Sequence, residues 1–358
     1  MVEYDLLIKG GLLIDSSQGI HSEMDIGICK GRVSVLGKDL DPTRSRKVLD
    51  ANSQIVTPGL IDMHTHVFYL LGHWRSQTLE ADSTSLAKGV TTVLDVGSIC
   101  PEDVEAFRHY IVNKSKTRVY ALLYMKPNGK PREYAQIIKD NSDFVLGCKY
   151  HHETLGTMDM LLLAREAADW GRCILMCEPY GPKLRTILDY LYRGDVLTHS
   201  FHPSPRRGLL DEDGRVLPEV WEAVRRGVYL DQGHGSAGFG FDVAGKCLNQ
   251  GLSPYTISTD LHRSCVNGPV YDMPTTMSKW MAIGMPLDEV VKRATLHPAI
   301  VLKKEEEIGT LRVGACGDVS CFKLLEGEFT FEDVVGEGRT GRYKLETTHV
   351  IRAGEVIV

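Results

Sequence analysis

The sequence predicts an α/β protein, a (β/α)8 TIM barrel with a small discontinuous β domain built from both ends of the chain. From residue 59 onward, short β-rich runs alternate with helical stretches, which is the pattern of repeated β-α-β units. Eight such units with right-handed crossovers close into a barrel, and the roughly 240 residues available match the usual size of about 250. Before residue 57 and after residue 303 the chain returns to β pattern without alternating helices.

Eight β-rich runs supply the predicted barrel strands. They are residues 60–63, 91–96, 119–125, 144–149, 173–177, 195–199, 228–231 and 255–260. Helical stretches are predicted between or after them at residues 76–88, 102–113, 158–170, 184–192, 242–249, 272–284 and 287–295. A doubly wound open sheet is the competing architecture. It is disfavoured because no Gly-x-Gly-x-x-Gly turn follows an early strand.

The two ends of the chain predict one β-sandwich-like domain, residues 1–56 with 304–358, beside a barrel of residues 57–303. Gly10-Gly11 and Lys30-Gly31-Arg32 each separate two β-rich runs, the spacing of a hairpin. Pro58 cannot donate a backbone hydrogen bond, so it marks the passage into the barrel.

Composition narrows the class of protein. The 358 residues are 43% hydrophobic, enough for a sizeable core, and carry a formal net charge of −6 without a basic block. This argues against a nucleic-acid partner and favours a small-molecule substrate. Nine scattered cysteines without a repeated Cys-x-x-Cys spacing indicate reduced thiols. We therefore expect a cytoplasmic protein with no export signal and no membrane span.

Metal-binding residue types stand at the ends of several predicted strands. His64 and His66 follow the first strand, and side chains two residues apart on a strand share a face, so both imidazoles can reach one metal ion. Lys149, His199 and Asp260 end the fourth, sixth and eighth strands. The carboxyl ends of the strands are where a barrel builds its active site.

These residues and three longer runs resemble the amidohydrolase superfamily, and within it the deacetylase-like and dihydroorotase-related enzymes. The runs are residues 194–201, 230–235 and 257–262, and residues 272–279 add to the match. The resemblance covers nearly the whole chain. It implies one or two divalent metals per chain, usually Zn²⁺, and hydrolysis of amide or ester bonds by a metal-bound hydroxide.

The resemblance also implies a ligand set. His64, His66 and Asp260 would bind the first metal, and His199 and a residue of strand five the second. Lys149 would bridge the two metals as a carbamate derived from CO2, because a neutral amine that captures CO2 becomes an anionic ligand with two oxygens. The alternatives are a surface lysine at the end of a strand for Lys149 and a core histidine for His199.

Strand five departs from the family pattern. Its end normally carries a histidine, but here Cys177 and Glu178 are the nearest residues able to bind a metal. A thiolate is a good zinc ligand, so Cys177 is one candidate; Glu178 is its rival, because Pro179 follows and a turn could swing the carboxylate inward. The third reading is that Cys177 is a small buried hydrophobe and the second metal is weak or absent.

Asp260 is the predicted general base and acid. A carboxylate beside the nucleophile can take its proton and then hand it to the leaving group; the alternative role is a helix N-cap. Tyr150, His151, His234, His262 and Arg263 fall on the loops after strands four, seven and eight, where substrate-positioning residues sit in barrels. The glycines around His234 would let backbone amides approach a ligand.

The sequence thus favours a metal-dependent amidohydrolase acting on a small N-acyl or O-acyl compound. A cyclic amidohydrolase of the dihydroorotase or hydantoinase kind is the alternative within the same class. A non-catalytic barrel with an incomplete metal site is the alternative outside it. The acyl group, the leaving group and the oligomeric state, a homo-oligomer included, stay open.

Overall fold

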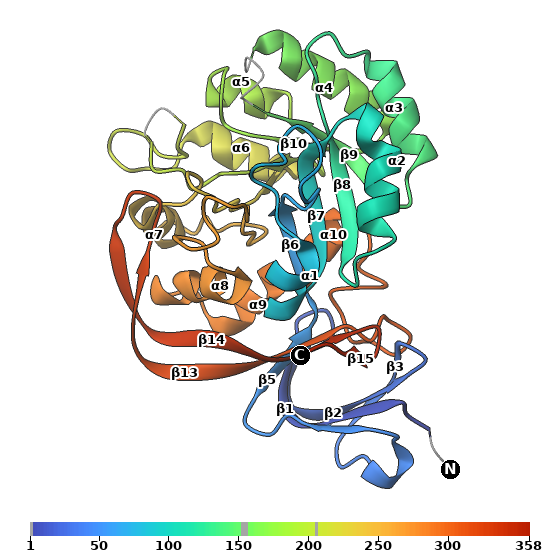
Figure 1. The fold of residues 1–358 in the computed structure, drawn as a ribbon. Coiled ribbons are helices and arrows are strands. Elements are labelled where there is room, and N and C mark those ends of the chain that lie inside the picture. The colour runs from blue at the N-terminus through green and yellow to red at the C-terminus, as the bar shows by residue number, and fades with distance from the viewer. Residues whose placement is uncertain (1–2, 152–156, 205–206) are drawn as a thin grey trace.

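Two sheets organise the molecule (Figure 1). The computed structural model describes residues 3–151, 157–204 and 207–358. One sheet is parallel and curled and lies among the helices. The other is mixed, and it gathers strands from both ends of the chain at the opposite side of the molecule. Each has its own hydrophobic cluster, the larger one belonging to the parallel sheet and its helices.

The parallel sheet has seven strands in the order β12-β11-β10-β9-β8-β7-β6. Their bounds are β6 Leu60–Thr65, β7 Val90–Ile99, β8 Arg118–Tyr124, β9 Val145–Tyr150, β10 Ile174–Cys177, β11 Val196–Leu197 and β12 Tyr229–Leu230. Seven of the eight predicted strands are present. Because every pairing in this sheet is parallel, the carboxyl ends of all seven strands meet at one edge.

The eighth predicted strand is not formed as a strand. Residues 255–261 instead make two isolated parallel bridges, Thr256 with Asp231 and Leu261 with Thr65, one at each end of the seven-stranded path. The Asp260 amide also donates to the His64 carbonyl at 2.7 Å. Asp260 has a φ of 49°, which an extended strand does not contain. The segment therefore lies between the first and last strands of the curl, and its backbone contacts both.

Helices follow most strands. Their bounds are α1 Ala81–Thr84, α2 Val104–Phe107, α3 Pro131–Asp140, α4 Met158–Gly171, α5 Leu184–Asp189, α6 Pro218–Arg226, α7 Phe241–Asn249, α8 Met273–Ala282, α9 Leu287–Ala294 and α10 Leu296–Val301. Short 3-10 or π turns are η1 Pro42–Arg44, η2 Leu86–Lys88, η3 Pro101–Asp103 and η4 Arg108–Val112. The prediction of one helix over residues 76–88 is wrong, because Glu80 caps α1 with its carboxylate and only four residues of α-helix follow.

The mixed sheet runs β15-β14-β13-β5-β1-β2-β3, with β4 beside β1. Its strands are β1 Leu6–Asp15, β2 Ile20–Cys29, β3 Arg32–Gly37, β4 Val48–Asp50, β5 Ile55–Pro58, β13 Val319–Glu332, β14 Gly338–Arg352 and β15 Glu355–Val356. In place of the facing sheets of a sandwich, these strands form one hydrogen-bonded sheet. The predicted hairpin at Gly10-Gly11 is wrong: both glycines lie within β1, where the register with β2 shifts. The hairpin at Lys30-Gly31 is confirmed.

The long β13–β14 hairpin reaches from the mixed sheet back to the helices α7 and α8 (Figure 1). Its middle contacts α8, where the Leu345 amide donates to Ser278 Oγ at 3.0 Å. Asp333, in the turn of the hairpin, accepts a hydrogen bond from the Phe241 amide at the start of α7. Across the described ranges, no helix combines the length and apolarity needed to cross a membrane.

Candidate metal and active site

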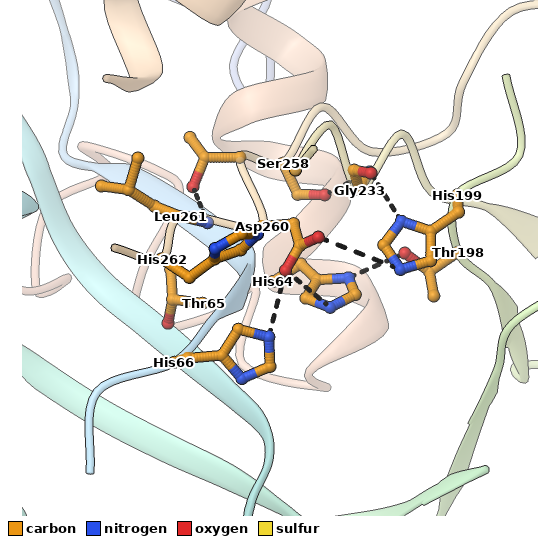
Figure 2. Close-up of polar contacts among 12 residues, drawn as sticks. His64, Thr65, His66, Thr198, His199, Gly233, Ser258, Asp260, Leu261 and His262 are labelled. Atoms are coloured by element: carbon orange, nitrogen blue, oxygen red, sulfur yellow. Dashed lines mark hydrogen bonds and ion pairs between the residues drawn. The ribbon is translucent and has the colours of Figure 1, made fainter. Parts of the chain in front are cut away.

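Two histidines at the carboxyl end of β6 point toward Asp260 (Figure 2). Their side chains are 1% and 3% exposed. His64 Nε2 lies 3.4 Å and His66 Nε2 3.0 Å from Asp260 Oδ1. The alternation of side chains along a strand places positions 64 and 66 on one face, as the sequence predicts.

The outer nitrogens of two imidazoles are held so that the inner nitrogens face the site. Thr198 Oγ1 donates its only proton to Asp231 Oδ2 at 2.7 Å. It must therefore accept from His64 Nδ1, which lies 2.8 Å away. His199 Nδ1 donates to the Gly233 carbonyl at 2.6 Å, since a carbonyl can only accept. In the neutral rings both Nε2 atoms then carry a lone pair toward Asp260, which is the state in which imidazole binds a metal.

Asp260 lies among these imidazoles (Figure 2). One ligand atom each from His64, His199 and Asp260 lie within 4.8 Å of one another, close enough for a single metal ion. His199 and Asp260 have left-handed backbone conformations, with φ of 53° and 49°, and such strained residues concentrate at functional sites. Burial alone would raise the pKa of Asp260, but the imidazoles, His64 foremost, hold it well below its usual range.

The loop after β12 passes against these side chains. A Cβ at Gly235 would lie 2.0 Å from Asp260 Oδ2, and one at Gly233 would lie 2.3 Å from Thr198 Oγ1. Both glycines have positive φ, so other side chains are disfavoured twice over. Their amides are occupied within the protein, by Ser258 Oγ and the Thr259 carbonyl. These glycines let the loop approach protein side chains. The sequence suggests that their backbone amides face a ligand, but both amides donate hydrogen bonds within the protein.

His234, between those glycines, serves this loop and does not line the cavity. It is fully buried, and its Nδ1 donates to the Gly235 carbonyl at 3.0 Å. Its Nε2 accepts a hydrogen bond from Lys279 Nζ at 2.7 Å. Lys279 also donates to the carbonyls of Pro269 and Glu332, each at 2.7 Å, and so connects α8 and β13 to the loop. Burial and the Lys279 cation lower the pKa of His234 to about 3, so its ring is neutral.

Glu178 is the strand-five residue that reaches the site. It lies just after β10, its side chain is 2% exposed, and its Oε1 is 3.4 Å from His199 Nε2. The same oxygen is 3.2 Å from Lys149 Nζ and 3.5 Å from His151 Nε2. Burial lowers the pKa of His199, but Glu178 offsets this and the net shift is upward. One carboxylate oxygen of Glu178 thus lies close to three basic side chains, Lys149, His151 and His199.

Lys149 is fully buried at the end of β9. Although its Nζ is near Glu178, the angles do not make a hydrogen bond, and no other partner is found for it among the residues the structure describes. A buried ammonium that has one ion pair and no hydrogen bond is costly. Conversion of the amine to an anionic carbamate would remove that cost, so the side chain fits the bridging role the sequence suggests.

Cys177 lies away from the site. In the pairing of β9 with β10, Lys149 is opposite Met176, and Cys177 is opposite Tyr150. Neighbours in a parallel sheet share a face, so Met176 and, two residues on, Glu178 are on the side of Lys149 while Cys177 is on the other. Cys177 belongs to the hydrophobic cluster, and burial raises the pKa of its thiol well above the usual value.

A cavity of about 640 Å³ opens over the imidazoles and carboxylates around Asp260. Its lining residues are His64, His66, His73, Trp74, Ser76, Gln77, His151, Glu178, Tyr180, His199, Ser236, Ala237, Asp260, His262 and Ser264. Of the predicted substrate contacts, His151 and His262 line it. Tyr150 does not, because it is buried and donates through its hydroxyl to the Tyr180 carbonyl; Arg263 is exposed outside the lining.

Several residues at the site were not predicted from the sequence. Trp74 lies with its ring 4.6 Å from that of His66 and 5.5 Å from that of His151, and Tyr180 lies 6.1 Å from His199. Both stand in irregular segments without periodic pattern. The supporting pair Thr198 and Asp231 stand in or beside predicted strands, where they read as ordinary strand residues. Only their shared contact with His64 shows their role.

The whole chain is similar to known hydrolases and deaminases. It is 30% identical over 366 residues to a deacetylase of Brucella anthropi, covering 94% of this chain and 89% of that protein. A crystal structure of an adenine deaminase matches with a TM-score of 0.90 at 27% identity, covering 99% and 100% of the two chains. A dihydroorotase structure matches with a TM-score of 0.87 at 26% identity, covering 98% of each. No protein-family model matches the chain.

Proposed function

The chain belongs to the amidohydrolase superfamily, and from this we propose that it is a metal-dependent hydrolase of the amide or ester bond in a small N-acyl or O-acyl compound. We take residues 57–303 as a (β/α)8 barrel and residues 1–56 with 304–358 as a second domain. The observation that carries the proposal is the ring of imidazole and carboxylate atoms around Asp260, at the carboxyl ends of the strands, under a cavity.

The residues present fit a divalent metal, Zn²⁺ above all, at one or two positions. His64, His66 and Asp260 would hold the first ion, and His199 with Glu178 the second, with Lys149 between them as a carbamate. Imidazole nitrogens and carboxylate oxygens are the donors zinc takes in catalytic sites. Bound there, the metal would act as a Lewis acid and lower the pKa of a water molecule from about 15.7 to about 7.

Asp260 is the proton carrier of the proposed reaction. Its carboxylate is held ionised by the surrounding imidazoles, so it can accept the proton of the attacking water and then deliver it to the leaving nitrogen or oxygen. The loop with Gly233 and Gly235 leaves Asp260 room and fixes His199. The lining imidazoles and the Trp74 ring would position the acyl compound beside it.

Glu178, and not Cys177, is expected to hold the second metal. Glu178→Gln should lower the bound metal from about two to about one per chain, because an amide is a poor anionic ligand, while Cys177→Ala should leave the count unchanged. Metal analysis of the desalted proteins measures both, with the cysteine variant as the matched control at the adjacent position. Loss of metal in Cys177→Ala with full retention in Glu178→Gln would reverse the assignment.

A cyclic amide is the second candidate substrate. The dihydroorotase structure overlays nearly the whole chain, and opening a cyclic amide requires the same attack and the same proton transfer at Asp260. The two candidates differ in what must fit the cavity of about 640 Å³, a ring or an open acyl chain. A barrel that has lost catalysis is the third reading.

A substrate screen separates these readings. We expect turnover of at least one compound among N-acyl amino acids and acetylated hydroxy acids, abolished by chelation and restored by Zn²⁺. Turnover restricted to dihydropyrimidines or hydantoins would establish the cyclic candidate instead. Protein that carries less than about one metal equivalent and hydrolyses neither set would be a non-catalytic barrel.

A further inference from the structure

A second group of potential metal ligands lies at the rim of the cavity. His73, Cys100 and Asp103 each offer one ligand atom, and the three atoms lie within 4.8 Å of one another. His73 also lines the cavity. Cys100 directly follows β7, and Asp103 ends the short turn η3, so two rigid elements hold two of the three side chains.

The spacing within this group suits a tetrahedral ion. Cys100 Sγ and His73 Nδ1 form a hydrogen bond at 3.6 Å. A Zn–S bond of about 2.3 Å and a Zn–N bond of about 2.0–2.1 Å, set at the tetrahedral angle, separate sulfur from nitrogen by roughly 3.5–3.6 Å. The two atoms therefore already stand at the distance that a shared ion would impose.

The surroundings favour the ligating state of His73 but oppose that of Cys100, because burial raises the pKa of the Cys100 thiol to about 12 and a metal must displace its proton. The His73 ring lies 4.4 Å from that of Tyr124, and this partial burial lowers the pKa of His73, so its imidazole is neutral near pH 7 although the residue is solvent-exposed. Asp103 Oδ2 accepts from the Cys100 amide at 2.9 Å, which holds the carboxylate beside the thiol. Lys126, a nearby cation, is ion-paired with Glu102.

We propose that His73, Cys100 and Asp103 form a peripheral site for a late first-row divalent metal such as Zn²⁺, separate from the ligands around Asp260. Binding would release the thiol proton to solvent as the thiolate joins the ion, and the fourth position would be open to water. With three protein ligands and an exposed histidine, the ion exchanges with the medium. This inference stands whether or not the proposed hydrolase activity is correct.

An ion at this site would act on the cavity entrance. His73 is next to Trp74, whose ring packs against His66. A bound ion with its water would occupy space at the rim and fix the His73 loop, so a concentration of Zn²⁺ beyond that needed to fill the central site should inhibit. Such inhibition should be absent in a variant without the thiol.

Cobalt provides a direct readout of thiolate ligation. Protein whose central site is filled with zinc is titrated with Co²⁺, and a sulfur-to-cobalt charge-transfer band in the near ultraviolet is followed. We expect the band to saturate near one added equivalent, to vanish in Cys100→Ser, and to remain in Cys177→Ala. Asp103→Asn should keep the band with Co²⁺ affinity at least about tenfold weaker.

The proposed site stands only if the charge-transfer band comes from Cys100. Its absence from the wild-type protein, or its persistence in Cys100→Ser, overturns the site, and so does its loss only in Cys177→Ala. If Cys100→Ser does not fold, alkylation of the wild-type protein answers the question: Zn²⁺ must protect Cys100 from iodoacetamide in peptide mapping, and equal labelling with and without Zn²⁺ overturns the proposal.

Discussion

Replacing Asp260 by asparagine is expected to lower kcat by roughly 10²–10⁴-fold while the protein stays folded and keeps much of its metal. The amide has the shape of the carboxylate and one oxygen with which to bind a metal. It cannot accept the proton of the attacking water. The remaining imidazoles, held by Thr198 and the Gly233 carbonyl, should keep their places.

Three measurements define this result: steady-state kinetics on the substrate found in the screen, metal content, and the midpoint of thermal unfolding. Asp213→Asn, the same chemical change at an exposed position, serves as the control and should leave all three unchanged. Activity of Asp260→Asn close to wild type would remove Asp260 from proton transfer. Loss of all metal from Asp260→Asn would show that the main role of Asp260 is to bind the metal.

The position of the central residues could be predicted because parallel strands place their carboxyl ends together. His64, Lys149, His199 and Asp260 each end a run that reads as a β-strand, and in the structure they surround one point. The alternation of strand and helix was sufficient to bring them there. His64, Lys149 and His199 are placed by their own strands or by the residues directly after them, whereas Asp260 is placed by a segment that bridges to residues at both ends of the parallel sheet.

The face of a strand on which a given side chain lies, and the conformation of the turns, could not be predicted in the same way. The choice between Cys177 and Glu178 depends on the register of β10 against β9, which places Met176 opposite Lys149 and so turns Glu178 inward. Gly10-Gly11 has the composition of a turn, but it is a bulge within β1 because β2 continues past it. His234 was predicted to be a loop residue that contacts substrate. Its buried position depends on a hydrogen bond from Lys279, which is distant in sequence.

Lys149 occupies the most demanding position of the site. Its ammonium is enclosed beside Glu178, which also contacts His151 and His199. Gly97 of β7 leaves room for the stem of Lys149, because a Cβ there would lie 3.3 Å from Lys149 Cγ. A cation there would repel a divalent metal, whereas a carbamate would attract it. Removal of the side chain should consequently remove an anionic ligand and leave a cavity of its own shape.

We expect Lys149→Ala to lose most of its bound metal and its activity, and to recover part of both when a short carboxylic acid such as acetate or propionate is added. The acid fits the space vacated by the side chain and supplies the two oxygens of the missing carbamate. Lys149→Met is the matched control: it fills the same space without any oxygen, so it should lose metal and activity and show no rescue. Metal content and turnover are measured across a series of acid concentrations. Full activity in Lys149→Ala without added acid would remove the carbamate from the site, and equal rescue of Lys149→Met would show that the acid acts elsewhere. Rescue confined to the alanine variant is the result that places an anionic bridge at the end of β9.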